Sequence, residues 1–294
     1  MLNNPQFYVE QLNKQIERVK EQYKSFRFYD LGSYALNRLT PRTSFELVEN
    51  IAYGLKSRQR LDLYRAKKTL AHRPLIVFVH GGAWQHGDKK DYVFISESLA
   101  RAGYDVAVIN YHLAPQSIFP VYIDDIAQAL NYLNQHQQRL NISTQHIILM
   151  GHSSGAFNVM SVVYHPQQQA IHCRDQIKAI VGFAGPYHFD YKGDPLAQDA
   201  FDQSVPYQEV MPFYFVETNS IKHYLFLAEN DQIVKKSNTF DMHQKLLQAG
   251  NHSHVAVIAK TGHVTIIATL SSLFSQYFKT KRTLLNLLKE THPA

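Results

Sequence analysis

The stretch that decides the fold is Ile147-Ile148-Leu149-Met150-Gly151-His152-Ser153-Ser154-Gly155, an apolar run followed directly by the pattern G-x-S-x-G. A short apolar run bounded by glycine is typical of a buried β-strand. The two glycines let the chain turn sharply from strand into helix, which holds the middle serine in a strained, exposed position. The sequence therefore predicts a nucleophile elbow with Ser153 as the nucleophile.

A second glycine motif stands about 70 residues earlier, in Val79-His80-Gly81-Gly82-Ala83-Trp84. A serine nucleophile needs backbone N–H groups that bind the negative charge developing on the substrate oxygen. Consecutive glycines let bare backbone approach that oxygen. We therefore expect Gly81, Gly82 and Ala83 to form an oxyanion hole, which the N–H of Ser154 completes.

The nucleophile also needs a base that takes its proton and an acid that orients the base. His263 is the predicted base, because it follows the apolar run 255–259 on a glycine turn and precedes a helical pattern. Asp231 is the better candidate for the acid, and Glu229 is its competitor. Both follow the apolar run 224–227, and residues two apart share a face of an extended segment, so spacing alone leaves both open.

Short apolar runs alternate with helical patterns along most of the chain. Strands are predicted over residues 45–53, 59–65, 75–79, 106–109, 147–150, 180–183, 224–227 and 255–258, and helices over 91–102, 121–136, 154–164, 237–249 and 265–288. Continuous apolar strands that alternate with helices are typical of a parallel sheet covered on both faces. We therefore expect one α/β domain over residues 1–294, with a mostly parallel eight-stranded sheet. Its first two strands should form a half-exposed antiparallel pair at one edge.

Two further segments are predicted around this sheet. Residues 1–30 carry apolar side chains three and four residues apart from Val9 to Phe26, which predicts an amphipathic N-terminal helix. We expect it to pack on its own domain; a flap or cap over the active site and a contact in a homodimer are the alternatives. Residues 184–223 form the longest connection between strands, so they are predicted to be a lid or pocket wall. Its aromatic residues are Tyr187, Phe189, Tyr191, Phe201, Tyr207, Phe213, Tyr214 and Phe215.

Composition argues against several classes of function. The 30 Lys and Arg residues exceed the 24 Asp and Glu residues, but they are scattered, which argues against a nucleic-acid surface. The single cysteine, Cys173, excludes an internal disulfide and indicates a reducing compartment, so a cytoplasmic protein is expected. No apolar stretch has the length of a membrane span, so no stable membrane insertion is expected. The glycine loops lack nucleotide-binding spacing, and His252-Ser253-His254 has no supporting ligand nearby, so neither a cofactor nor a metal is expected.

Taken together, these motifs resemble those of the α/β-hydrolase family, and the resemblance runs from about Phe45 to the C-terminal helix. It is strongest to esterases with a His-Gly-Gly loop, which include hormone-sensitive-lipase-like carboxylesterases and arylformamidases. The run Asn110-Tyr111-His112-Leu113-Ala114-Pro115 is similar to the Asn-Tyr-Arg-Leu-Ala-Pro of that branch. The family carries its acid in Gly-x-x-Asp-x-x-Val, which the run 228–234 matches apart from Ala228 in the first position, and this favours Asp231 over Glu229. The order of serine, acid and histidine is also that of the family.

The resemblance implies a serine carboxylic-ester hydrolase with a small-molecule ester as substrate. Two departures from the family pattern are Ala83, where the lipase-type loop has a third glycine, and Ser154, where alanine is usual. Trp84, His152 and Tyr187 are predicted to contact the substrate, and the aromatic segment favours small or aromatic acyl groups. An arylformamidase or other small amidase is the alternative. A non-catalytic small-molecule receptor is a third reading, against which the retained serine and histidine argue.

Overall fold

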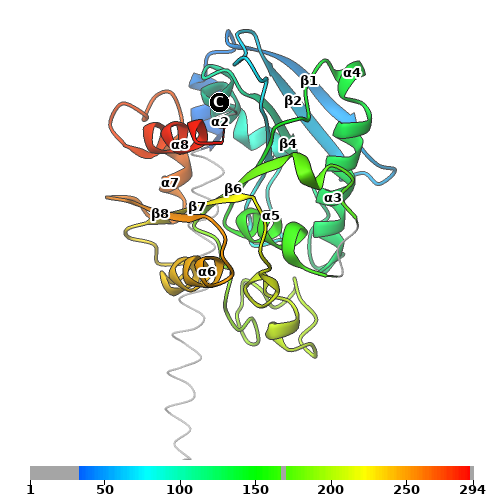
Figure 1. The fold of residues 1–294 in the computed structure, drawn as a ribbon, viewed down its shortest axis with the longest axis vertical. Coiled ribbons are helices and arrows are strands. Elements are labelled where there is room, and N and C mark those ends of the chain that lie inside the picture. Colours follow the sequence, from blue (N-terminus) through cyan, green and yellow to red (C-terminus); the bar gives the residue numbers. More distant parts are fainter. Residues whose placement is uncertain (1–32, 167–169, 292–294) are drawn as a thin grey trace, which may run out of the picture.

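An eight-stranded sheet forms the centre of the computed structural model, which describes residues 33–166 and 170–291 (Figure 1). The predicted N-terminal helix lies outside the described residues. In chain order the strands are β1 (Phe45–Ala52), β2 (Arg60–Ala66), β3 (Leu75–Val79), β4 (Asp105–Ile109), β5 (Ile147–His152), β6 (Ile177–Phe183), β7 (Lys222–Ala228) and β8 (Ser253–Ile258). Their order across the sheet is β1-β2-β4-β3-β5-β6-β7-β8. The predicted eight-stranded, mostly parallel sheet is confirmed.

Strand β2 alone runs against the others, because it pairs antiparallel with both β1 and β4 while β3 to β8 pair in parallel. The predicted antiparallel pair at one edge is therefore present. The expectation that β2 is half-exposed is wrong, since most of its side chains on both faces are buried, and the helices between β3 and β4 pack against it. Tyr64 packs on Phe45 at 5.0 Å between ring centroids, and Asp62 forms a buried ion pair with Lys89 at 2.8 Å.

Helices cover both faces of the sheet, as predicted (Figure 1). They are α2 (Val93–Ala100), α3 (Val121–Gln135), α4 (Gln137–Leu140), α5 (Ser154–Tyr164), α6 (Ser237–Gln248), α7 (Thr265–Ala268) and α8 (Thr280–Lys289), with 3-10 helices η1 (Lys89–Tyr92), η2 (Arg174–Gln176), η3 (Tyr207–Glu209) and η4 (Pro212–Phe215). In β3, Val77 and Val79 pack with α3 and α5, whereas Ile76 and Phe78 pack with α2 and α8. This alternation makes two apolar cores, one on each face.

The single long helix predicted over residues 265–288 is wrong, because α7 ends at Ala268 and α8 begins at Thr280. Hydroxyl side chains in the gap bond to nearby backbone, which competes with helix formation. Thr269 Oγ1 donates to the carbonyl of Ile266 at 2.5 Å, and the N–H of Phe274 donates to Ser271 Oγ at 3.3 Å.

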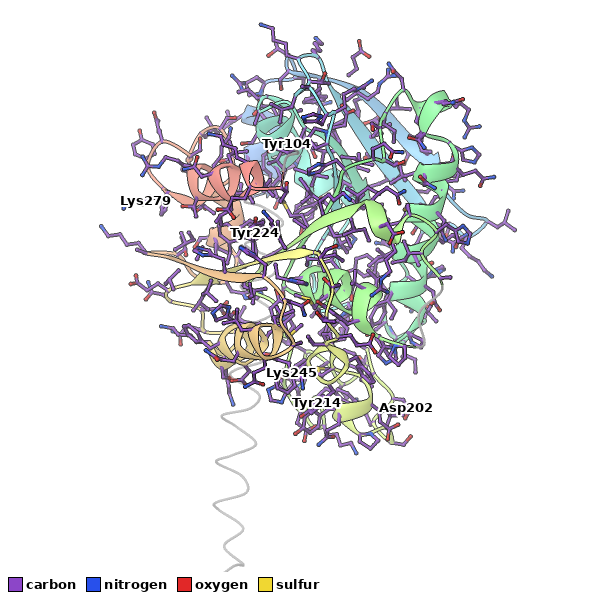
Figure 2. The ribbon with its side chains drawn as sticks, viewed as in Figure 1. Tyr104, Asp202, Tyr214, Tyr224, Lys245 and Lys279 are labelled. Atoms are coloured by element: carbon purple, nitrogen blue, oxygen red, sulfur yellow. The ribbon has the colours of Figure 1, made fainter. Side chains whose placement is uncertain are left out.

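The long connection between β6 and β7 contains only the short helices η3 and η4 and packs against α5 and α6. Figure 2 shows Asp202 and Tyr214 on this connection, at the end of the molecule opposite to Tyr104. Across the described residues, no helix combines the length and the apolar character needed to cross a membrane.

Candidate active site

The predicted elbow lies between β5 and α5, with Ser153 in the turn. Its backbone has φ 54° and ψ −123°, a strained conformation for a residue with a side chain. A Cβ at Gly151 would lie 2.2 Å from the carbonyl oxygen of Gly155, and a Cβ at Gly155 would lie 2.1 Å from that of Val79. Only glycine at both positions lets the strand, the turn and the helix pack so closely.

The structure brings Ser153, His263 and Asp231 together at the carboxyl ends of β5, β8 and β7. Ser153 Oγ lies 2.8 Å from His263 Nε2, and His263 Nδ1 lies 2.9 Å from Asp231 Oδ2. All three residues are buried. The other oxygen of Asp231 accepts hydrogen bonds from the N–H groups of Ile233 and Val234, both at 2.9 Å.

The surroundings of Asp231 keep its carboxyl group ionised. Burial raises the pKa of Asp231, but the hydrogen bond and charge of His263 outweigh that effect, together with the N–H groups of Val234 and Ile233. The pKa of Asp231 therefore lies below its usual value. Glu229 is turned elsewhere, because its Oε2 accepts the N–H of Lys260 at 2.9 Å.

The glycine loop after β3 lies against the elbow. A Cβ at Gly81 would be 2.9 Å from the carbonyl oxygen of His152, so the loop can approach the elbow this closely only because Gly81 has no side chain. The carbonyl of Gly82 accepts two hydrogen bonds, from Gln85 N at 3.0 Å and His86 N at 2.9 Å, which closes a tight turn. Ala83 follows with φ 50°.

Several backbone N–H groups of the glycine loop and of the start of α5 are available to a ligand. Among the described residues, no acceptor is seen for the N–H groups of Gly82, Ala83 and Ser154. Ser154 is the first residue of α5, where N–H groups have no acceptor within the helix and the helix dipole favours negative charge.

Replacing Gly82 with alanine is expected to lower kcat by about 10²–10³-fold, the size of effect seen when one oxyanion donor is lost. The added Cβ would lie 2.2 Å from the carbonyl oxygen of His86, and φ is 129°, so the turn has to move and the Ala83 N–H moves with it. Steady-state kinetics on a short-chain ester measures the loss.

The matched control is Gly250→Ala, which also has a positive φ of 79° but has no neighbour nearer than 3.8 Å. It is expected to cost a little stability and leave kcat unchanged. A Gly82→Ala enzyme with the same kcat as the Gly250→Ala enzyme would contradict the role given to this loop.

Two of the three predicted substrate contacts lie away from the cavity next to Ser153. The ring of His152 is buried behind the elbow, where Nε2 donates to the carbonyl of His263 at 2.8 Å. Tyr187 is fully buried, and a Cβ at Gly182 would lie 1.8 Å from its hydroxyl, so its ring fills space beside β6. Both side chains pack inward from the strand ends, so neither lines this cavity. Trp84, the third, lines the cavity, and its Nε1 donates to Asn158 Oδ1 at 2.9 Å.

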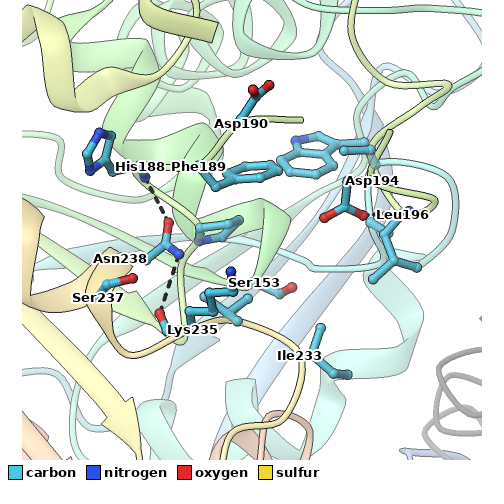
Figure 3. Close-up of a pocket in the computed structure, with 15 residues that line it drawn as sticks. Ser153, His188, Phe189, Asp190, Asp194, Leu196, Ile233, Lys235, Ser237 and Asn238 are labelled. Carbon is cyan, nitrogen blue, oxygen red and sulfur yellow. Dashed lines mark hydrogen bonds between the residues drawn. The ribbon is translucent and has the colours of Figure 1, made fainter. Parts of the chain in front are cut away.

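The cavity has a volume of about 340 Å³ and opens beside Ser153 (Figure 3). Of the eight aromatic residues predicted to form its wall, only Phe189 lines it. Most of the others pack within the connection or against the domain, whereas Tyr214 is exposed. Tyr191, for example, stacks on Phe201 at 4.7 Å between ring centroids, and Phe201 contacts Trp84 edge-on at 4.8 Å. The rest of the lining comes from the loops after β3, β6 and β7 and from the first turn of α6, namely Ala83, Pro186, His188, Asp190, Asp194, Leu196, Ala197, Ile233, Val234, Lys235, Ser237 and Asn238.

Sequence reasoning missed the charged part of this lining. A signal was present, because ligands of open α/β sheets bind beyond the carboxyl ends of the strands, where Asp190, Asp194 and Lys235 stand in the sequence. In residues 33–166 and 170–291, no group of three or more His, Cys, Asp or Glu side chains is arranged to hold a metal ion.

Three buried histidines predict a loss of stability in mild acid. Burial lowers the pKa of His80 and of His223 to about 4 and that of His152 to about 3. In an unfolded chain the pKa of histidine is about 6.5, so below this pH the unfolded state binds protons that the folded state does not. The free energy of unfolding should therefore fall as the pH drops from 6.5 to 4, by up to about 1.4 kcal/mol per pH unit for each histidine.

Urea unfolding at pH 7, 6 and 5 measures this effect. The lowered pKa of Asp231 contributes stability that is lost only below about pH 4, outside this window. His223→Gln removes the one of these three histidines that lies away from Ser153. In this variant the free energy of unfolding should fall less steeply with decreasing pH. Equal urea midpoints at pH 7 and pH 5 would contradict the expectation.

Comparison with models of known protein families shows to which family the chain belongs. The model of the BD-FAE family matches residues 61–246, well over half of the sequence and a range that contains the elbow and Asp231. The chain belongs to the BD-FAE family. The predicted membership of the α/β-hydrolases is thereby confirmed.

Curated relatives of this BD-FAE protein bear the names of hydrolytic enzymes. A kynurenine formamidase of Drosophila melanogaster is 31% identical over 140 residues, which are 48% of this chain and 46% of that protein. A probable isoprenylcysteine alpha-carbonyl methylesterase of Oryza sativa is 28% identical over 152 residues, covering 49% of this chain and 36% of that protein. The matched region thus spans less than half of the length of either relative.

Solved structures show that the BD-FAE chain shares its fold with esterases. Esterase B from Lactobacillus rhamnosis superposes with a TM-score of 0.75 at 18% identity, over 95% of this chain and 96% of that one. A structure described as a bacterial heroin esterase gives a TM-score of 0.68 at 20% identity, over 85% of this chain and 86% of that one.

Proposed function

We propose that this protein is a serine carboxylic-ester hydrolase that acts on small or aromatic acyl esters through an acyl-enzyme. The observation that supports this most strongly is the pair of hydrogen bonds that link Ser153 Oγ to His263 and His263 to Asp231, at the side of a cavity. A nucleophile, its base and an orienting acid within hydrogen-bond distance are the groups that acyl transfer requires.

In the first half of the proposed reaction, Ser153 Oγ attacks the acyl carbon while His263 Nε2 takes its proton. The carbonyl electron pair moves onto the oxygen, and the N–H groups of Gly82, Ala83 and Ser154 donate to this oxyanion. The carbon–oxygen bond to the alcohol then breaks, and His263 returns the proton to the departing alkoxide. Asp231 holds the imidazole with its proton on Nδ1 and stabilises the imidazolium.

In the second half, water replaces the alcohol. His263 takes a proton from the water, whose oxygen attacks the acyl carbon, and the same N–H groups hold the second oxyanion. The bond to Ser153 Oγ breaks, the proton returns to Ser153, and the carboxylic acid leaves.

A second candidate function is that of an arylformamidase or other small amidase. It is favoured by the relative named kynurenine formamidase, which is 31% identical to this chain over 140 residues. The same residues would cleave a C–N bond, with His263 giving its proton to the leaving amine in place of an alkoxide.

One series of substrates separates these candidates. The purified enzyme is assayed on p-nitrophenyl esters of two to sixteen carbons and on N-formylkynurenine, with Ser153→Ala as the blank. A cavity of about 340 Å³ holds a small ligand, so we expect the highest kcat/KM at two to six carbons. Faster turnover of N-formylkynurenine than of any ester would favour the second candidate, and a maximum at long chains would exclude the small-substrate proposal.

A further inference from the structure

A carboxylate that the proposed reaction does not use faces the catalytic cavity. Figure 3 shows Asp194 across the cavity from Ser237 and Asn238, on the side of Leu196. Its Oδ1 accepts the N–H of Leu196 at 2.9 Å, which leaves the other oxygen for a ligand. Asp190 lines the same cavity, and its Oδ1 accepts the N–H of Lys192 at 3.0 Å.

No basic side chain in the described part of the chain neutralises these two carboxylates. Neither Asp190 nor Asp194 has a Lys, Arg or His nitrogen of the described residues within 4.0 Å. His188, which also lines the cavity, is already paired with Asp241 at 2.8 Å. Lys235 is the one lysine of the lining and comes from the loop after β7, so the lining carries more negative than positive charge.

The rest of the cavity wall suits an organic cation, because it offers apolar surface to the carbon skeleton and aromatic rings to the charged group. Leu196 and Ile233 provide aliphatic surface, and Trp84 and Phe189 provide aromatic rings. Aromatic rings attract cations through their negative faces, and a carboxylate beside them adds direct charge attraction.

We propose that the ester hydrolysed at Ser153 carries a cationic nitrogen, which Asp194 binds while the aromatic and aliphatic wall holds the rest of the molecule. This inference rests on the proposed hydrolase function. It assigns Asp194 as a specificity-determining residue and amine-bearing or quaternary-ammonium esters as the substrate class.

The test compares two esters of the same shape, acetylcholine and 3,3-dimethylbutyl acetate, which differ in having a trimethylammonium or a tert-butyl group. The variant Asp194→Asn removes the charge but keeps an oxygen that can accept the N–H of Leu196, so the loop is retained. The ratio of kcat/KM for the cationic ester to that for the neutral ester is expected to fall about tenfold in this variant, with the neutral ester little affected. In the wild type, 0.5 M NaCl should lower the same ratio.

The matched control is Asp199→Asn, an exposed residue of the same connection that does not line the cavity. It should leave the ratio unchanged. An equal ratio in wild type and Asp194→Asn, or an equal fall in both variants, would overturn the inference. Absence of Ser153-dependent hydrolysis of the neutral ester would instead overturn the proposed function.

A binding measurement keeps the inference testable without turnover. Trp84 is the only tryptophan of the chain and lines the cavity, so its fluorescence reports occupancy. In a Ser153→Ala background, the Kd of phenyltrimethylammonium is expected to rise about tenfold when Asp194→Asn is added. An unchanged Kd would count against Asp194 as the cation-binding group.

Discussion

Replacing Ser153 with alanine is expected to lower the rate of ester hydrolysis by about 10³–10⁶-fold. In the proposed reaction its Oγ is the only protein atom that bonds to the acyl carbon, and among the described residues His263 forms a hydrogen bond with no other hydroxyl. The residual rate should be that of a cavity which binds the ester and its oxyanion but cannot form the acyl-enzyme. The measurement is kcat/KM on p-nitrophenyl acetate for both purified proteins.

Two control measurements accompany this one. The Ser153→Ala variant keeps both glycines that allow the elbow, so its circular dichroism and urea midpoint should stay close to those of the wild type. A fluorophosphonate probe should label the wild type at Ser153 and leave the variant unlabelled. Wild-type turnover by Ser153→Ala would show that the nucleophile is another group.

The second large effect is expected for Asp231→Asn, a loss of about 10⁴-fold in kcat. The amide would donate a hydrogen bond to His263 Nδ1 and so favour the tautomer that carries its proton on Nε2. That tautomer cannot accept the proton of Ser153. The geometry changes little, so the loss should appear in kcat more than in KM.

Glu229→Gln is the matched control, since Glu229 stands two residues away and bonds to the N–H of Lys260 instead. Its rate should stay within a few-fold of the wild type. If both substitutions cost the same, or if Glu229→Gln costs more, the acid would be Glu229.

The strands could be predicted from the sequence because continuous apolar runs such as 75–79 and 147–150 have few other structures open to them. The positions of Ser153, Asp231 and His263 followed, because loops after parallel strands meet at one edge of the sheet. The burial of both faces of β2 could not be predicted, since it depends on which helices pack on the sheet at that strand.

Side-chain direction in irregular segments was the other limit. Periodicity assigns faces in strands and helices, but the connection between β6 and β7 has almost no regular structure. Whether Tyr187 or Phe189 turns toward the cavity depends on backbone angles that an aromatic-rich composition does not encode. The break after Ala268 was missed for a related reason, because a local bond such as that of Thr269 to Ile266 leaves the apolar spacing unchanged.

The contact between Gly182 and Tyr187 restricts the order in which these two positions can change during evolution. A methyl group at position 182 would lie 1.8 Å from the tyrosine oxygen and 3.0 Å from the ring carbon that bears it, so even phenylalanine at position 187 leaves little room. A smaller residue at 187 must therefore come first, and the void that it opens can then be filled from 182. Relatives should therefore carry either glycine at position 182 with a large ring at 187, or a larger residue at 182 with a small one at 187. The intermediate, with small residues at both positions, contains a void and is less stable than either.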